Sequence, residues 1–459
     1  MNSLSFVHNP RLAFAVAAFA GCVWLNQGPT VGRYEELTIE ASGHLLLRAW
    51  LPFAFAYRRS SDEELYFATA NAVRGVPYDE HIVLSKRGTT SPAFEHFPPP
   101  DGHWHWPYSE VPLEYPALVL PFVLLPAVLA STFGAFALSF GVLMGALLLL
   151  SVALAVHADA RASPEARARG ARGWWLAAAL FLSQGGLLVQ RVDAVAAVFL
   201  GLALWAATAR KPLLLGLAVA LAAGVKIVPI LVLLPLMAAD RATFSSRRSI
   251  ARVSAGVALG LAVTFLPMIA LSPSAFASFI EYHLARGLHI ESSYGAIVSL
   301  VELASGNPQG SALSFGSYNL RGATADGLAA VSTPLLVLSI LVLTVWLARL
   351  GAPESEKLRR NRIASAGLAA LAFVWLFGKV FSPQYMTWAI PFAVVASDRR
   401  IPALLMAAMA VSQIYLRGFY DYVVAMRPLG VVALEVRLVV LAVMTFLVLR
   451  AARCYHVVQ

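Results

Sequence analysis

Residues 134–156 read GAFALSFGVLMGALLLLSVALAV, an unbroken apolar stretch without a charged side chain. A helix of ~20 such residues is long enough to cross the hydrocarbon core of a bilayer. Similar stretches recur along the 459-residue chain, so that hydrophobic residues make up 59% of it and charged residues only 13%. Soluble domains carry roughly 25% charged residues. The sequence therefore predicts an all-α polytopic membrane protein, with residues 1–459 forming a single transmembrane domain.

The Arg and Lys residues lie mainly in short clusters between the apolar stretches, which is the pattern of cytoplasmic loops. The net charge of +10 and the pI near 9.8 therefore do not indicate nucleic-acid binding. The clusters that mark the cytoplasmic side are 161–172, 210–211, 241–252, 357–362, 399–400 and the tail after Arg450. The two cysteines, Cys22 and Cys454, indicate no disulfide framework.

The predicted single spans are those that keep every one of these clusters on the cytoplasmic side. They are 134–156, 173–189, 194–209, 253–271, 327–347, 363–379, 386–396, 401–416 and 429–449. Residues 12–25 are interpreted as an uncleaved first helix rather than a signal peptide. The stretch 213–239 must leave the cytoplasmic side and return, yet it is too short for two full helices. It therefore predicts a broken pair that turns near Gly224, Lys226 and Pro229 at the outer side, which is a candidate site.

Residues 112–132 carry four prolines, which would break several backbone hydrogen bonds of a spanning helix. We therefore expect a membrane-surface or re-entrant helix there. The resulting topology has about twelve crossings, both termini in the cytoplasm, and outer loops at about 26–133 and 272–326.

The predicted outer segments hold most of the side chains that a reaction could use. Their short motifs are SDEELY (61–66), RGVPY (74–78), LEYP (113–116), RVD (191–193), GVK (224–226), HLARGLHIES (283–292) and KVFSPQYMTW (379–388). No glycine-rich phosphate loop, Cys-x-x-Cys pair or Gly-x-Ser-x-Gly elbow occurs in an apt setting, so the nucleotide-sugar chemistry of soluble folds is not supported.

The order of these motifs resembles that of the GT-C glycosyltransferases. The pieces at 75–78, 283–292 and 382–385 are most similar to glycosyltransferase family 87, the bacterial branch that uses polyprenyl-phosphate mannose. The resemblance implies sugar transfer from a lipid-phosphate donor on the outer face, with an acidic residue of the first loop as the base and without a nucleotide or metal cofactor. Two departures are Tyr115-Pro116-Ala117, where many relatives have Tyr-Pro-Pro, and an insertion at 91–108 rich in His, Trp and Pro.

Glycosyl transfer needs a carboxylate that accepts the proton of the acceptor hydroxyl. The resemblance implies Asp62 for this role through its spacing to Tyr66, with Glu63 next and Glu64 third. The alternative is that these acids only mark the start of a helix, where the helix dipole favours them.

Substrate contacts are predicted at Tyr66, Glu114, Tyr115, Arg191, Asp193, Lys226, His283, Arg286, His289, Glu291, Lys379, Gln384 and Tyr385. Lys226 and Lys379 could contact the donor phosphate or snorkel to the interface. Arg191 and Asp193 could contact substrate or pair with each other. The segment 283–291 is interpreted as substrate contacts on an interfacial helix rather than as a metal site. Arg437 lies within the last span, and its partner is not evident from the sequence.

The insertion carries His96, His103, Trp104, His105 and Trp106, which could stack on sugar rings or belong to an interfacial belt. The predicted function is transfer of a hexose, with mannose favoured, from a polyprenyl-phosphate donor to a lipid or glycan acceptor for envelope glycan biosynthesis in a bacterial cytoplasmic membrane. The alternatives are a secondary transporter and a non-catalytic envelope-assembly protein. A transporter of this size usually has two similar halves, whereas here one long outer loop has no counterpart.

The charge pattern generates a prediction about topology. A reporter fused after Arg172 should read cytoplasmic, and one fused after Gly306 should read outside, because the basic clusters stay on the cytoplasmic side. The measurement is paired reporter activity in cells. The reverse result would place the acidic loop in the cytoplasm and remove the site assignment.

Overall fold

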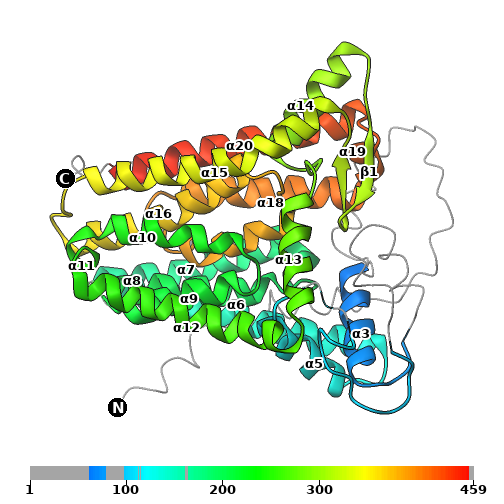
Figure 1. Cartoon of the computed structure of the whole chain (residues 1–459). Coiled ribbons are helices and arrows are strands. Elements are labelled where there is room, and N and C mark those ends of the chain that lie inside the picture. Colours follow the sequence, from blue (N-terminus) through cyan, green and yellow to red (C-terminus); the bar gives the residue numbers. More distant parts are fainter. Residues whose placement is uncertain (1–60, 79–97, 112, 114, 161–163, 454–459) are drawn as a thin grey trace.

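A computed structural model describes residues 61–78, 98–111, 113, 115–160 and 164–453 of the chain. The predicted first helix, both cysteines, Pro112 and Glu114 lie outside the described residues. Most of the described part is helical, and the long helices run side by side through the molecule (Figure 1).

Among the described residues, five helices are long and apolar enough to cross a membrane. They are α6 (Phe133–Ala160), α12 (Arg247–Leu271), α15 (Ala323–Arg349), α18 (Arg400–Gly418) and α20 (Pro428–Arg453). Large apolar side chains such as Leu266, Leu338 and Phe446 point outward from α12, α15 and α20. Exposure of this kind is unfavourable in water but not against acyl chains. The predicted helical, polytopic membrane protein is confirmed, while the number of about twelve crossings stays a prediction.

Four further helices of the described part pack in the bundle. They are α7 (Pro164–Gln184), α8 (Asp193–Thr208), α9 (Pro212–Ala223) and α16 (Glu356–Phe377). Helix α8 packs between α6 and α9 and is buried along most of its length. An all-round apolar sequence such as that of α8 suits this central position, because no face of the helix has to meet water.

The stretch 213–239 is broken, as the sequence predicts. Helix α9 ends at Ala223, the 3-10 helix η4 spans Val228–Val232, and α10 spans Leu233–Ala239. The chain turns at Gly224, where a Cβ atom would lie 2.4 Å from Thr264 Oγ1. Pro229 follows in the first turn of η4, where its missing N–H leaves no helical bond unmade. Lys226 therefore lies on irregular backbone between two short helices.

The predicted span 386–396 is wrong. The chain forms the 3-10 helix η5 (Pro383–Ala389) and then a single turn, α17 (Ile390–Ala393). Pro383 and Pro391 start these two elements, and each removes a backbone donor that a continuous α-helix would need. Nearly all of these residues are buried, and η5 and α17 both pack against α8. The apolar composition of this segment thus reflects burial inside the bundle.

Helices α9 and α12 approach each other along a seam of glycines. A Cβ atom on Gly216 would lie 2.1 Å from Val253 O, and one on Gly256 would lie 2.0 Å from Leu213 O. Gly256 and Gly260 form a small-xxx-small pair, which in membranes lets two helix backbones meet. The seam holds α12 against the first half of the broken pair.

A group of shorter elements lies at one end of the bundle, on the right in Figure 1. They are α3 (Ser61–Val73), η2 (Ala117–Val119), α5 (Leu120–Val128), η3 (Gly185–Leu188), α13 (Pro273–Ala285), α14 (Ser293–Ser305), β1 (Ser311–Ser314), β2 (Ser317–Leu320) and α19 (Tyr420–Val424). Strands β1 and β2 form an antiparallel hairpin in which Ser314 pairs with Ser317. Phe315 and Gly316 at its turn both have positive φ, as in a type I′ turn. This hairpin is an exception to the all-α prediction.

In the described part of the predicted surface segment 112–132, the helical elements are the short helices η2 and α5. Pro116 precedes η2, while Pro121 and Pro126 lie in α5. At nine residues, α5 is too short to cross a bilayer. The expected short helix is present, and its placement at the membrane surface stays a prediction.

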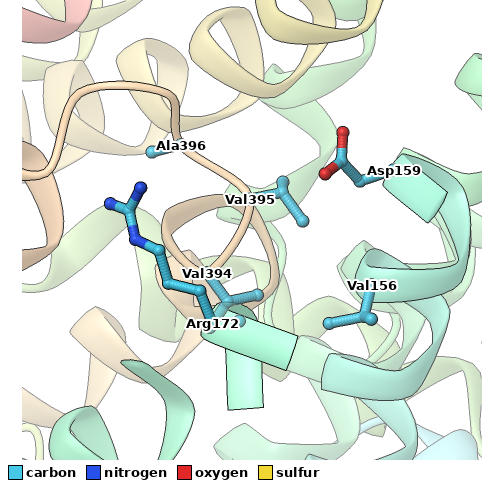
Figure 2. A pocket seen from close by; sticks show the side chains of 7 residues that line it. Val156, Asp159, Arg172, Val394, Val395 and Ala396 are labelled. Carbon is cyan, nitrogen blue, oxygen red and sulfur yellow. The ribbon is translucent and has the colours of Figure 1, made fainter. Parts of the chain in front are cut away.

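The basic clusters meet at the opposite end of the bundle, where α11 (Arg241–Phe244) lies. Arg359 donates to Asp240 Oδ2 at 2.7 Å, and Arg210 pairs with Glu356 at 3.2 Å. Beside them is a small cleft, whose lining residues are Val156, Asp159, Arg172, Gly173, Val394, Val395 and Ala396 (Figure 2). The loops predicted to share one side of the membrane thus share one end of the molecule, away from the candidate site.

Candidate functional site

The acidic residues Asp62, Glu63 and Glu64 form the first turn of α3, so the helix-start interpretation of their position is correct. Their surroundings differ, however. Glu63 is fully buried, whereas the Asp62 side chain keeps 21% of its surface exposed. The Asp62 carboxylate also forms an ion pair with Arg191, which precedes α8. Of the three candidate bases, Asp62 and Glu64 are partly exposed and Glu63 is buried.

Asp193 is the first residue of α8, where the partial positive charge of the helix start favours a carboxylate. Both of its oxygens lie 3.1 Å from Lys226 Nζ. Trp388 Nε1 donates a further bond of 2.8 Å to Asp193 Oδ1. The two residues of the Arg-x-Asp motif therefore pair across the fold, Arg191 with Asp62 and Asp193 with Lys226, and not with each other.

Aromatic rings cover the lysine. Lys226 Nζ lies 4.6 Å from the centre of the Tyr385 ring, which stacks on Trp388 at 4.4 Å. Gln384 lies on the same 3-10 helix and is half-buried. Gln184 holds this helix in place by donating to Pro383 O at 2.8 Å. The motif at 382–385 thus serves to bring an aromatic ring over the cation.

Two tyrosines link α3 to the segment before η2. The hydroxyls of Tyr66 and Tyr115 lie 3.2 Å apart, and both rings lie against the buried core. Tyr108 donates to Tyr115 O at 2.8 Å. Glu114, predicted beside Tyr115 as a substrate contact, lies outside the described residues. The predicted Tyr66 and Tyr115 are therefore neighbours, positioned one turn beyond the acidic start of α3.

A second cluster surrounds Glu291. Tyr415 donates to Glu291 Oε1 at 2.5 Å, and Tyr420 donates to Oε2 at 3.4 Å. Arg437 donates to the backbone oxygen of Glu291 and to the Tyr415 hydroxyl, and Arg437 Nη1 lies 3.7 Å from Glu291 Oε1. The buried cation of the last helix thus has a partner more than a hundred residues away in the chain.

His289 lies beside this carboxylate in a fixed orientation. Its Nδ1 atom lies 2.7 Å from Phe381 O, and because a carbonyl only accepts, Nδ1 carries the proton. Burial lowers the pKa of His289 to about 3, so the ring is neutral at physiological pH. Its Nε2 atom is then an acceptor, 3.6 Å from Glu291 Oε2. Burial also raises the pKa of Glu291.

The basic residues His283, Arg286 and Lys379 were predicted as substrate contacts, and they lie near one another. Burial, together with the charges of Arg286, Lys226 and Lys379, lowers the pKa of His283 to about 4. Arg286 donates to Ser317 Oγ at 2.9 Å. Lys379 donates, also at 2.9 Å, to the carbonyl oxygen of Leu284 in the last turn of α13. Among the described residues, no three His, Cys, Asp or Glu side chains gather as a metal site.

Arg191 joins the two clusters. Burial lowers its pKa to about 10, and the nearby charges of Asp193, Glu291, Tyr385 and Tyr420 act in the opposite direction. The guanidinium therefore stays charged at neutral pH while it sits between the acids of both clusters. One region of the molecule thus brings together predicted residues from four segments: the first outer loop, the broken pair, 283–292 and 379–388.

The comparison with protein families addresses what such a region does. The family model described as Glycosyltransferase family 87 matches residues 113–383, more than half of the chain. The chain belongs to glycosyltransferase family 87. This family is of the GT-C type, so the resemblance inferred from the short motifs is confirmed. No curated protein matches the sequence. The glycosyltransferase assignment replaces the transporter and assembly-protein alternatives.

Some residues of the site were not predicted. Trp388, Tyr415 and Tyr420 bind the carboxylates of Asp193 and Glu291, yet in the sequence they are ordinary aromatic residues of apolar segments. Arg437 did give a signal, because a cation within a span needs a partner. In this family member Asp62 and Arg437 both lie outside the 113–383 match, one on each side of it.

The Glu291 cluster generates a prediction about stability. Replacing Arg437→Leu leaves the buried carboxylate without its nearest cation, and breaking such a pair costs about 3–5 kcal/mol. The variant should therefore unfold at a clearly lower temperature in detergent, measured by thermal scanning of purified protein. The exposed Arg349→Leu is the matched control and should change little. Adding Glu291→Gln to Arg437→Leu should recover part of the loss. Equal melting temperatures for the Arg437 and Arg349 variants would contradict the ion-pair assignment.

Proposed function

We propose that this glycosyltransferase moves a hexose, with mannose favoured, from a polyprenyl-phosphate donor to a lipid or glycan acceptor on the outer face of a bacterial cytoplasmic membrane. The observation that carries the proposal is the ion pair between Arg191 and the partly exposed carboxylate of Asp62. A second ion pair, between Lys226 and Asp193, places another cation close by, because Asp193 is only two residues from Arg191. A base and cations side by side are what transfer from a phosphate-linked sugar requires.

Asp62 is the proposed base. Its carboxylate accepts the proton of the acceptor hydroxyl while that oxygen bonds to the anomeric carbon of the donor sugar. The bond from this carbon to the phosphate oxygen breaks, and polyprenyl phosphate leaves with the electron pair. Arg191 holds the carboxylate in place through their ion pair. Glu63, the second candidate, is fully buried in α3 and is a weaker choice for direct proton transfer.

The leaving phosphate is proposed to bind to four cationic side chains, those of Arg191, Lys226, Arg286 and Lys379. Lys226 has three N–H donors, and its two bonds to Asp193 leave one for an anion. Arg286 and Lys379 lie near enough to Lys226 that all three charges act on His283. Several cations of this kind can offset the charge that develops as the sugar–phosphate bond breaks.

The orientation is part of the proposal. The basic loops meet at one end of the bundle, and the site residues lie at the other. Under the positive-inside rule the basic end is cytoplasmic, so the site faces outside. About twelve crossings with both termini in the cytoplasm fit this arrangement. Membrane lipids would then surround the bundle and also supply the environment of the donor.

The base assignment is tested by Asp62→Asn. Asparagine keeps the shape but cannot accept the proton, and loss of a general base typically lowers a rate roughly 10²- to 10⁴-fold. We expect that loss in a transfer assay with a polyprenyl-phosphate sugar donor, with donor binding retained. Glu64→Gln, one position beyond the buried acid of the same turn, is the control and should stay active. Transfer by folded Asp62→Asn within a few-fold of the unchanged protein would show that another group is the base.

The phosphate assignment is tested at Lys226. Because Lys226 also neutralises buried Asp193, the informative variant is Asp193→Asn with Lys226→Met, which leaves no unpaired charge. Loss of a charged hydrogen bond, worth about 1.5–3 kcal/mol, should weaken donor affinity about tenfold or more. Binding is measured on reconstituted protein, with exposed Lys357→Met from the opposite end as the control. Unchanged affinity in the double variant would mean that Lys226 serves only its ion pair.

A further inference from the structure

Residues 98–111 form a strap that lies across the end of α3. Gly102 N donates to Gly75 O and His105 N donates to Val73 O, both at 2.8 Å. The contact is close, since a Cβ atom on Gly75 would lie 2.0 Å from His103 O. The strap is therefore fastened to the helix whose first turn carries the proposed base, and it precedes the family match.

Two tryptophans project from this fastened strap. Trp104 and Trp106 are 63% and 64% exposed, while the side chain of His105 between them is only 11% exposed. This alternation is that of an extended segment, in which every second side chain points to the same side. A pair of large apolar rings is thus held outward by a backbone that is itself hydrogen-bonded to α3.

The polar groups of the strap are turned toward one another. His105 Nε2 lies 3.2 Å from Asp101 Oδ1, which also accepts from His103 N at 2.9 Å. Glu110 Oε2 accepts from Trp106 N at 2.5 Å. Asp101 and Glu110 nevertheless keep 40% and 48% of their side-chain surface exposed, so charged groups flank the two rings. The strap therefore presents apolar rings next to charged groups, a combination that suits the headgroup level of a bilayer better than its acyl interior.

The strap lies at the level where the apolar surface of the bundle ends. Tyr108, at the end of the strap, is buried with Met268 and Phe279. Met268 is in the last turn of α12, and the neighbouring Leu266 and Ile269 are exposed on the outward face of that helix. Tryptophan is favoured at this level, because its ring is apolar while its N–H can reach water or a headgroup.

We propose that Trp104 and Trp106 insert into the boundary between headgroups and acyl chains, and that the strap thereby sets the depth of α3 in the membrane. The partner is a lipid surface. The part of the proposal that concerns catalysis rests on the proposed function, because a fixed depth for α3 keeps Asp62 level with the phosphate of a lipid-borne donor.

Insertion is tested by fluorescence in vesicles of phosphatidylcholine brominated at a shallow or a deep acyl position. The full-length protein is compared with Trp104→Phe/Trp106→Phe, and the difference between the spectra is the emission of the two strap rings. We expect this emission to be quenched more by shallow than by deep bromines. The buried Trp375, compared through Trp375→Phe, is the control and should be quenched by neither. Strap emission that is unquenched in both vesicles, or that changes only on addition of a glycan, would overturn the insertion.

The role in setting the depth of α3 is tested by activity. Trp104→Ala/Trp106→Ala should lower transfer from a long-chain lipid donor in vesicles several-fold, and should leave transfer from a short-chain, water-soluble donor in detergent unchanged. Equal transfer by the variant and the unchanged protein in vesicles would overturn this role. Failure of the proposed function is distinguishable, because the unchanged protein would then transfer no sugar from either donor while the quenching result would stand.

Discussion

A lysine on irregular backbone within an apolar bundle needs a counter-charge, and Asp193 provides it to Lys226 with both carboxylate oxygens. This ion pair constrains three parts of the fold. It ties the start of α8 to the break between α9 and η4, and Trp388 adds η5 through its bond to the same carboxylate. Arg191, two residues before Asp193, is thereby placed where it can pair with Asp62 of α3. The site is built outward from the buried pair.

In the Glu291 cluster a buried charge is likewise paired with an opposite charge, but more groups share the contact. There the charge of Arg437 is shared between a backbone oxygen, a tyrosine hydroxyl and a carboxylate, and the neighbouring histidine is neutral. The first cluster therefore includes partly exposed charged groups, while the side chains of Glu291, His289 and Arg437 in the second are enclosed. Arg191 lies between them, and acidic groups of both clusters, Asp193 and Glu291, raise its pKa against the effect of burial.

Much of the helical architecture could be predicted from the sequence, because span length, proline position and basic clusters are local signals. The break near Lys226 followed from counting residues between two basic clusters. The failure at 386–396 has an equally local cause, since apolar composition alone does not separate a buried 3-10 turn from a span. The site was predictable as a set of residues but not as a set of contacts. Asp62 pairs with Arg191, and Glu291 with Arg437, across separations in the chain that no spacing rule encodes. The hydrogen bonds from Tyr415 and Trp388 to buried carboxylates were not predicted for the same reason, since each joins residues far apart in the chain.

The glycine seam between α9 and α12 bears on how the proposed lipid-linked donor would reach the site. With backbone against backbone at Gly216 and Gly256, no space remains for an isoprenoid chain between these two helices. They can shift only together, because any sliding would drive carbonyl oxygens into the facing Cα positions. A tail that enters sideways from the bilayer must therefore pass along other helices of the bundle. Along this seam the two helices form one continuous face of the bundle.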